Sequence, residues 1–70
     1  MIWIKTNDRS FSAISINVSE KEGELPSLWA TRIDKVSYKV IEGDKEIVHE
    51  YREAIDYAVS KGEKVFDLTK

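Results

Sequence analysis

The chain contains no cysteine. It can therefore form no disulfide, no cysteine-based zinc site and no thiol nucleophile. Small secreted domains usually depend on disulfides, so this absence favours the cytoplasm as the compartment in which the chain works. Long hydrophobic runs are missing as well, because the apolar residues 1–4 are followed at once by Lys5. So short a run predicts neither a signal peptide nor a membrane span.

Histidine and glycine are also scarce. The only histidine is His49, whose charged neighbours indicate a solvated helix face rather than a catalytic base. One histidine without cysteine gives no transition-metal site. Gly23, Gly43 and Gly62 lie too far apart to form a glycine-rich phosphate loop. We therefore expect no enzyme, no metal and no other cofactor.

Strand-forming residues dominate the apolar part of the sequence. The 70 residues are 41% hydrophobic and 34% charged, which is typical of one small soluble domain spanning residues 1–70. Isoleucine and valine far outnumber leucine, and β-branched side chains favour strands. This composition argues against an all-helical bundle.

Two strands are predicted at residues 1–6 and 11–19, because apolar and polar residues alternate there. We expect a hairpin with Ile4 opposite Ile14 and a loop at residues 8–10. The apolar residues that this register gathers on one face are Ile2, Ile4, Ile14, Ile16 and Val18. The residues expected on the opposite face are Trp3, Lys5, Ala13, Ser15 and Asn17.

The middle of the chain is predicted to contain a loop and a third strand. Residues 20–28 lose the alternation and include a glycine and a proline, which indicates an exposed loop. Residues 30–42 predict a strand. Ile33 has the opposite parity to the other apolar residues of this strand, which predicts either a bulge or the start of a strand near Asp34 and Lys35.

A helix is predicted over residues 44–61, with Asp44 as its N-cap and Gly62 at its exit. A competing interpretation makes Gly43 part of a hairpin turn, continues the sheet through Ile47, and begins the helix only near Tyr51. The apolar residues that share one helical face are Ile47, Val48, Tyr51, Ala54, Ile55, Ala58 and Val59.

A last strand is predicted over residues 63–68, with Phe66 and Leu68 facing inward. The predicted fold is therefore α+β, a single domain in which one amphipathic helix covers one face of a mainly antiparallel sheet of four or five strands. The order is β-β-β-α-β, or β-β-β-β-α-β on the competing interpretation. A right-handed crossover is expected if the last strand runs parallel to the third.

Charge is distributed unevenly, since the helical segment is acidic and the strands are basic. A lone domain without reactive groups has only its surfaces to work with, so we expect a stoichiometric accessory, regulator or inhibitor. Its partner would be another protein, bound through an acidic helix flank and the loop near the proline, or a second copy in a homodimer, bound through the uncovered sheet face or an exposed strand edge. The candidate contact residues are Glu46, Glu50, Glu53, Tyr57, Leu25, Leu28 and Trp29.

The alternative function is binding of single-stranded nucleic acid on the uncovered sheet face. There an aromatic side chain would stack on bases and lysines would hold phosphates. Few lysines and an acidic domain argue against it. The candidate contact residues are Trp3, Lys5, Lys35 and Lys39.

Overall fold

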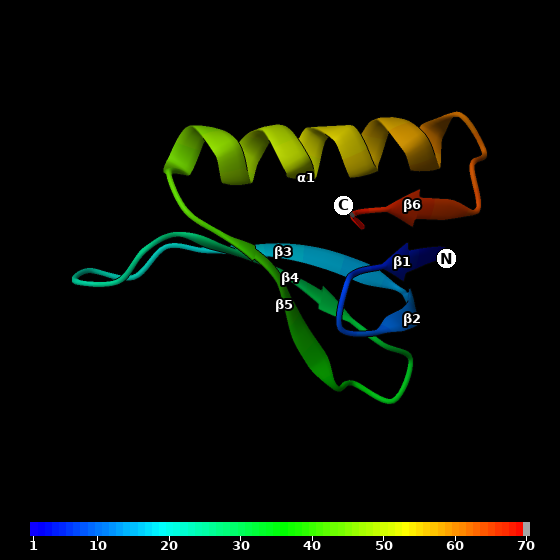
Figure 1. The fold of residues 1–70 in the computed structure, drawn as a ribbon, viewed down its shortest axis with the longest axis horizontal. Helices are drawn as coiled ribbons and strands as arrows, with labels where there is room; N and C mark the ends of the chain where they lie inside the picture. The colour runs from blue at the N-terminus through cyan, green and yellow to red at the C-terminus, as the bar shows by residue number, and fades with distance from the viewer. Residues whose placement is uncertain (70) are drawn as a thin grey trace.

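The structure, a computed structural model, describes residues 1–69 and contains six strands and one helix in this part of the chain (Figure 1). The strands form two three-stranded sheets, ordered β2-β1-β6 and β3-β4-β5. This confirms the predicted α+β class, with more strands than the four or five expected. The elements are β1 (Ile2–Lys5), β2 (Ser10–Ala13), β3 (Ser15–Ser19), β4 (Ser27–Thr31), β5 (Ser37–Glu42), α1 (Lys45–Ser60) and β6 (Val65–Asp67).

The first hairpin has a different register from the one predicted. Ile4 pairs with Phe11, so the expected pairing with Ile14 and the loop at residues 8–10 are wrong. The turn is tighter because the Thr6 amide donates to the Arg9 carbonyl at 2.8 Å, and the Thr6 hydroxyl donates to the same carbonyl at 2.9 Å. These turn hydrogen bonds favour the observed register over the one that the isoleucine pattern predicts.

The single strand expected over residues 11–19 is divided at Ile14. The amide of this residue donates to the Thr31 carbonyl at 2.8 Å, and its side chain is 48% exposed. Before the break the odd-numbered residue Ala13 faces the core, and after it the even-numbered residue Ile16 does. Ala13 is therefore buried, not on the outer face as predicted, and the break carries the chain from one sheet to the other.

The strand expected over residues 30–42 is a hairpin of β4 and β5, and the predicted bulge is its turn. The Arg32 amide donates to the Val36 carbonyl at 2.8 Å, and the Asp34 carboxylate accepts the Val36 amide at 3.2 Å. Lys35 has a φ of 70°. An Asx-type turn therefore explains the parity change. An irregularity does occur in this pair, but it lies opposite Leu28 and Trp29.

The predicted helix is confirmed, and the competing hairpin interpretation is wrong. Asp44 caps α1 through its backbone carbonyl, which accepts the Val48 amide at 3.0 Å. Beyond the last turn, Gly62 has a φ of +79°, a left-handed conformation that favours glycine. Continuous helical spacing of the apolar residues outweighs the strand propensity of Ile47 and Val48.

The last strand, β6, pairs parallel with β1, so the condition for the predicted crossover, a last strand parallel to the third, is not met. The Trp3 amide donates to the Lys64 carbonyl at 2.8 Å, and the Leu68 amide donates to the Lys5 carbonyl at 2.7 Å. Phe66 and Leu68 are half-buried and pack against the core, so their predicted inward direction is confirmed. Figure 1 shows β6 lying between β1 and α1.

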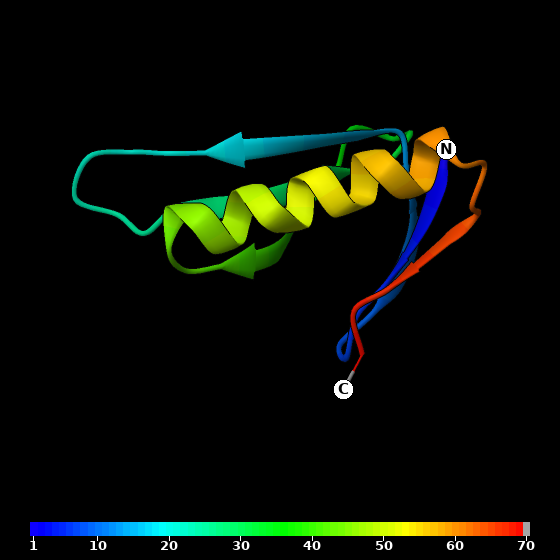
Figure 2. The ribbon, with the colours of Figure 1, turned by 90° about the horizontal axis from the view of Figure 1, so that it is seen from above.

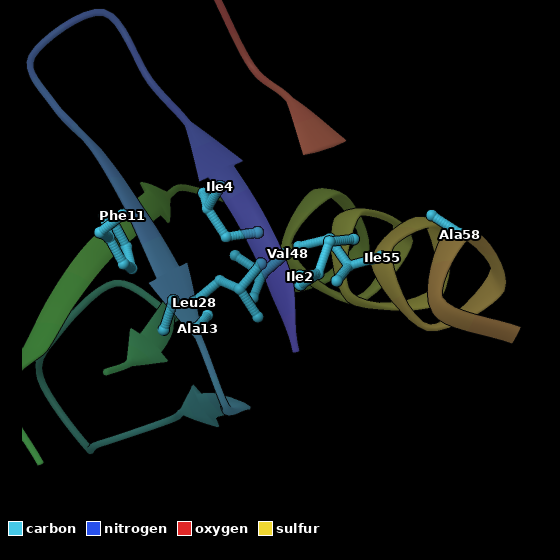
Figure 3. Close-up of a cluster of buried hydrophobic side chains, with 9 residues drawn as sticks. Ile2, Ile4, Phe11, Ala13, Leu28, Val48, Ile55 and Ala58 are labelled. Atoms are coloured by element: carbon cyan, nitrogen blue, oxygen red, sulfur yellow. The ribbon is translucent and has the colours of Figure 1, made fainter. Parts of the chain in front are cut away.

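One core joins both sheets to the helix (Figure 3). The rings of Phe11 and Tyr38, from different sheets, lie 5.0 Å apart and connect them. Leu28 is 0% exposed. It therefore belongs to the core, which corrects both the predicted loop to residue 28 and its proposed role as a surface contact. The buried core residues are Ile2, Ile4, Phe11, Ala13, Leu28, Ala30, Val48, Ile55 and Ala58.

Candidate protein-binding groove

A shallow groove lies between α1, β6 and β5. It consists of two adjoining hollows that share Tyr51 as a wall, and we call it the β6 groove. The hollow beside Ala54 and Phe66 is mainly apolar, whereas the one beside Thr6 and Asp8 has mixed polarity. Its apolar floor comes from half-buried side chains that complete the core on this side. The lining residues are Thr6, Asn7, Asp8, Val40, Ile41, Glu50, Tyr51, Ala54, Phe66 and Leu68.

Only acidic charges line the β6 groove, those of Asp8 and Glu50. Glu46 and Glu53 lie one helical turn to either side of Glu50, so they share its flank. Within residues 1–69, no ion pair neutralises these three glutamates. The groove therefore combines an apolar floor with an acidic rim that has no counter-charge in this part of the chain.

The predicted flank residue Tyr57 lies beyond the three glutamates, toward the end of the helix, and ends the acidic surface. Its side chain is 63% exposed, and the Lys61 ammonium lies 5.3 Å from its ring centre. Glu46, Glu50 and Glu53 are exposed as well. The four predicted flank residues thus lie together on the surface, and Glu50 is the one that lines the groove.

The opposite flank of α1 carries balanced charges. Glu20, just beyond β3, accepts a hydrogen bond from His49, whose Nε2 lies 2.8 Å from the carboxylate, and the Lys45 ammonium lies 4.0 Å away. The hydrogen bond to His49 and the charge of Lys45 hold the pKa of Glu20 below its ordinary value of 4.5. Farther along, Arg52 and Asp56 lie 3.9 Å apart. This flank therefore needs no external cation.

The other predicted protein contacts lie away from the groove. Trp29 is half-buried on the outer face of the β3-β4-β5 sheet, where its indole N–H donates to the Ser27 hydroxyl at 2.8 Å. Leu25, 60% exposed, lines the same shallow hollow as Trp29. The structure therefore brings these two together but separates them from the acidic flank on the helix.

The predicted nucleic-acid contacts are divided between the two sheets. Trp3, 44% exposed, shares the outer face of the β2-β1-β6 sheet with Lys5. Lys39 lies on the other sheet, 2.7 Å from the Glu42 carboxylate, and Lys35 lies in the β4–β5 turn. None of the three lysines lines the hollow beside Trp3, which is formed with Ser10, Phe11, Ser12, Arg32 and Ile33.

Sequence reasoning missed most of the groove floor. Val40 and Phe66 were recognisable as inward-facing strand residues, but their alternation could not indicate that they remain accessible at an open side of the core. The available signal was the acidic helix flank, which lies next to the groove. Tertiary contacts decide the rest, because β6 must first pair with β1.

Comparison of the chain with protein-family models, curated proteins and solved structures gives no match. Among the described residues, no cluster of three or more histidine, aspartate or glutamate side chains is placed to hold a metal ion. No helix in residues 1–69 is long and apolar enough to cross a membrane. The function is therefore argued from the geometry of the groove.

Proposed function

We propose that this chain is a non-catalytic protein-binding domain that acts stoichiometrically, as an accessory, regulator or inhibitor. The observation that supports this is the β6 groove, where accessible apolar side chains lie beside glutamates without a counter-charge. Protein interfaces combine a desolvated apolar centre with a polar rim in this way. The partner is another protein or, in a homodimer, a second copy of the chain.

Two further features support a binding rather than a catalytic role in the cytoplasm. His49 is engaged by Glu20 on the side of α1 away from the groove, so the groove has no histidine to act as a base. The absence of cysteine fits a reducing compartment. Both points favour the proposal without depending on the partner's identity.

Nucleic-acid binding receives less support. A phosphate-binding face needs several free cations near the stacking ring, whereas Lys39 is paired with Glu42 and the hollow beside Trp3 is bordered by Arg32, itself 3.1 Å from Asp34. A labelled oligonucleotide titrated at low and high salt tests this alternative. Salt-sensitive quenching of tryptophan fluorescence that is lost in Trp3→Ala would establish it.

The main experiment compares proteins captured from cell extract by the purified wild-type chain and by three variants. Ala54→Arg fills the groove with a good helix-forming residue, and Glu50→Lys reverses a charge on its rim. Glu22→Lys makes the same charge change in the exposed loop after β3. We expect one stoichiometric partner to be captured by the wild type and Glu22→Lys, and lost by the two groove variants.

Light scattering on the same proteins identifies self-association. A dimer that becomes a monomer in Ala54→Arg would make the second copy the partner. Equal capture by all four proteins, with no dimer, would disprove the proposed use of the groove. Circular dichroism of each variant confirms that α1 is intact.

A further inference from the structure

One long edge of β6 has no strand beside it. In the described part of the chain, β1 is the only strand hydrogen-bonded to β6. The Lys64 carbonyl and the Leu68 amide form hydrogen bonds to β1. Because backbone groups alternate along a strand, those of Val65 and Asp67 point toward the opposite, open edge.

This open edge borders the β6 groove. Phe66 and Leu68 line the groove, while the side chains of Val65 and Asp67 lie on the outer face. Figure 2, seen from above, shows β6 starting near the C-terminal end of α1 and running obliquely away from it, so the helix does not lie over the edge. A strand added there would therefore approach the flank of α1 at Glu50, which lines the same hollow as Phe66.

We propose that an extended segment of a partner protein adds to β6 as a further strand, with alternate apolar side chains in the β6 groove and lysine or arginine side chains facing the acidic flank of α1. Main-chain hydrogen bonds supply affinity in this mode of recognition, and pockets for alternate side chains supply specificity. The inference rests on the proposed function, which it makes specific by naming the chemistry of the bound segment.

Charge distinguishes the β6 edge from the β3 edge and favours a basic occupant. The edge strand β3 is also open on one side, but the helix flank next to it has Arg52 near Asp56 and Lys45 near Glu20. On the β6 side the glutamates have no such partners in residues 1–69. Pairing of two copies through β6 would bring two acidic flanks together, which like-charge repulsion disfavours. A basic segment of another protein would be attracted to the acidic flank instead.

The outer face of the edge carries balanced charge. The Asp67 carboxylate accepts hydrogen bonds from the Thr69 amide at 2.8 Å and from the Thr69 hydroxyl at 2.6 Å, and its neighbour in the ladder is Lys5 of β1. These hydrogen bonds and the charge of Lys5 hold the pKa of Asp67 below its ordinary value. The carboxylates without a counter-charge in residues 1–69 therefore lie on the helix side of an added strand, and the cationic side chains of the segment are expected there.

The test uses the full chain and three short synthetic peptides, followed by backbone nuclear magnetic resonance. The first peptide alternates valine and threonine between terminal lysines. The second replaces the lysines by glutamates, and the third keeps the composition of the first but groups the valines together. We expect only the first to bind, with shifts and slowed hydrogen exchange at the amides of Val65 and Asp67 and no change at the amides of β3.

Variants distinguish backbone pairing at the edge of β6 from side-chain contacts in the β6 groove. Val65→Pro removes the outward amide and Val65→Thr retains it, and the side chain is exposed in the native protein. We expect Val65→Pro and Ala54→Arg to abolish binding, Glu50→Lys to weaken it at least about tenfold, and Val65→Thr and Glu22→Lys to leave it unchanged. If Val65→Pro does not fold, the protection of the Val65 and Asp67 amides in the wild type decides the question.

Three results would overturn the inference: no binding of the first peptide at millimolar concentration, equal binding of the glutamate peptide, or binding without protection of the edge amides. The proposed function has its own outcome. A cellular partner that is lost in Ala54→Arg but retained in Val65→Pro would support use of the groove and disprove strand addition. A partner captured equally by the wild type and by both variants would disprove the use of the groove as well as strand addition.

Discussion

The two long sides of α1 differ in how their charges are compensated. On the β3 side, Glu20 lies close to His49 and Lys45 from the helix. On the β6 side, Glu46 and Glu50 face the exterior with no cation beside them in residues 1–69. Both sides end in an open strand edge, so the difference lies in charge and not in topology.

This comparison shows how so small a domain can offer one surface to a partner. A surface whose charges are already paired gains little from an added cation, because the new contact competes with an existing one. The β6 side offers apolar contact and uncompensated charge together.

The largest effect is expected in the core that both sides share. Ile55 is fully buried on α1, so Ile55→Ala should lower the free energy of unfolding by about 2–5 kcal/mol through lost burial and a residual cavity. Ile14→Ala removes a side chain that lies at the break between β2 and β3 and is half exposed, and should cost less than about 1 kcal/mol. Urea denaturation measures both, and equal losses would contradict the assigned positions.

The edge strand β6 should exchange its amide hydrogens faster than β4, the central strand of the other sheet. β6 has a single neighbour, whereas β4 lies between two strands. We therefore expect the Leu68 amide, which donates to Lys5, to exchange at least about tenfold faster than amides of β4 such as that of Ala30. Native-state hydrogen exchange provides the comparison. Equal rates would mean that β6 opens only when the whole domain unfolds.

The two ends of α1 should respond differently to alanine. Gly62 leads from the helix to β6 with a left-handed φ, so Gly62→Ala should destabilise the domain by about 1 kcal/mol. Gly43 precedes the helix without a positive φ, and no atom lies within 4 Å of an added Cβ there. Gly43→Ala should change stability by less than about 0.5 kcal/mol. Thermal unfolding of the two variants tests this difference.

The smallest effect is the pH dependence of the β3 side. Since the pKa of Glu20 is lowered in the folded chain, its ionised form stabilises the fold fully above the unfolded pKa near 4.5. That contribution is lost as the pH falls through the lower folded pKa. Between about pH 6 and pH 4, the melting temperature of Glu20→Gln should therefore fall less than that of the wild type. Glu22→Gln is the matched control and should follow the wild type.

Helix α1 could be predicted from the sequence because its determinants are local. The apolar residues repeat at helical spacing, Asp44 precedes the first turn and Gly62 follows the last. The acidic flank followed from the same periodicity, since Glu46, Glu50 and Glu53 are one turn apart. These features depend on residues that are close in the chain, and they placed half of the candidate site.

Strand pairing was predicted less well because it depends on competition between distant partners. The isoleucine pattern allowed a register with Ile4 opposite Ile14, but the Thr6 turn imposed one with Ile4 opposite Phe11. A shift of three residues exchanges the faces of a strand, since side chains alternate. The turn at Asp34 had a visible signal in the parity of Ile33, which fits a hairpin as well as a bulge.

Periodicity within a segment fixes which side of it is apolar, so the α+β class, the extent of the helix and the inward direction of Phe66 and Leu68 follow from local patterns. The pairing of β6 with β1, the division into two sheets and the position of the acidic flank next to an accessible groove depend on contacts between distant segments. Burial is a property of the assembled elements. A pattern of apolar residues specifies a face to be covered, and the packing of distant strands decides which part of that face stays open.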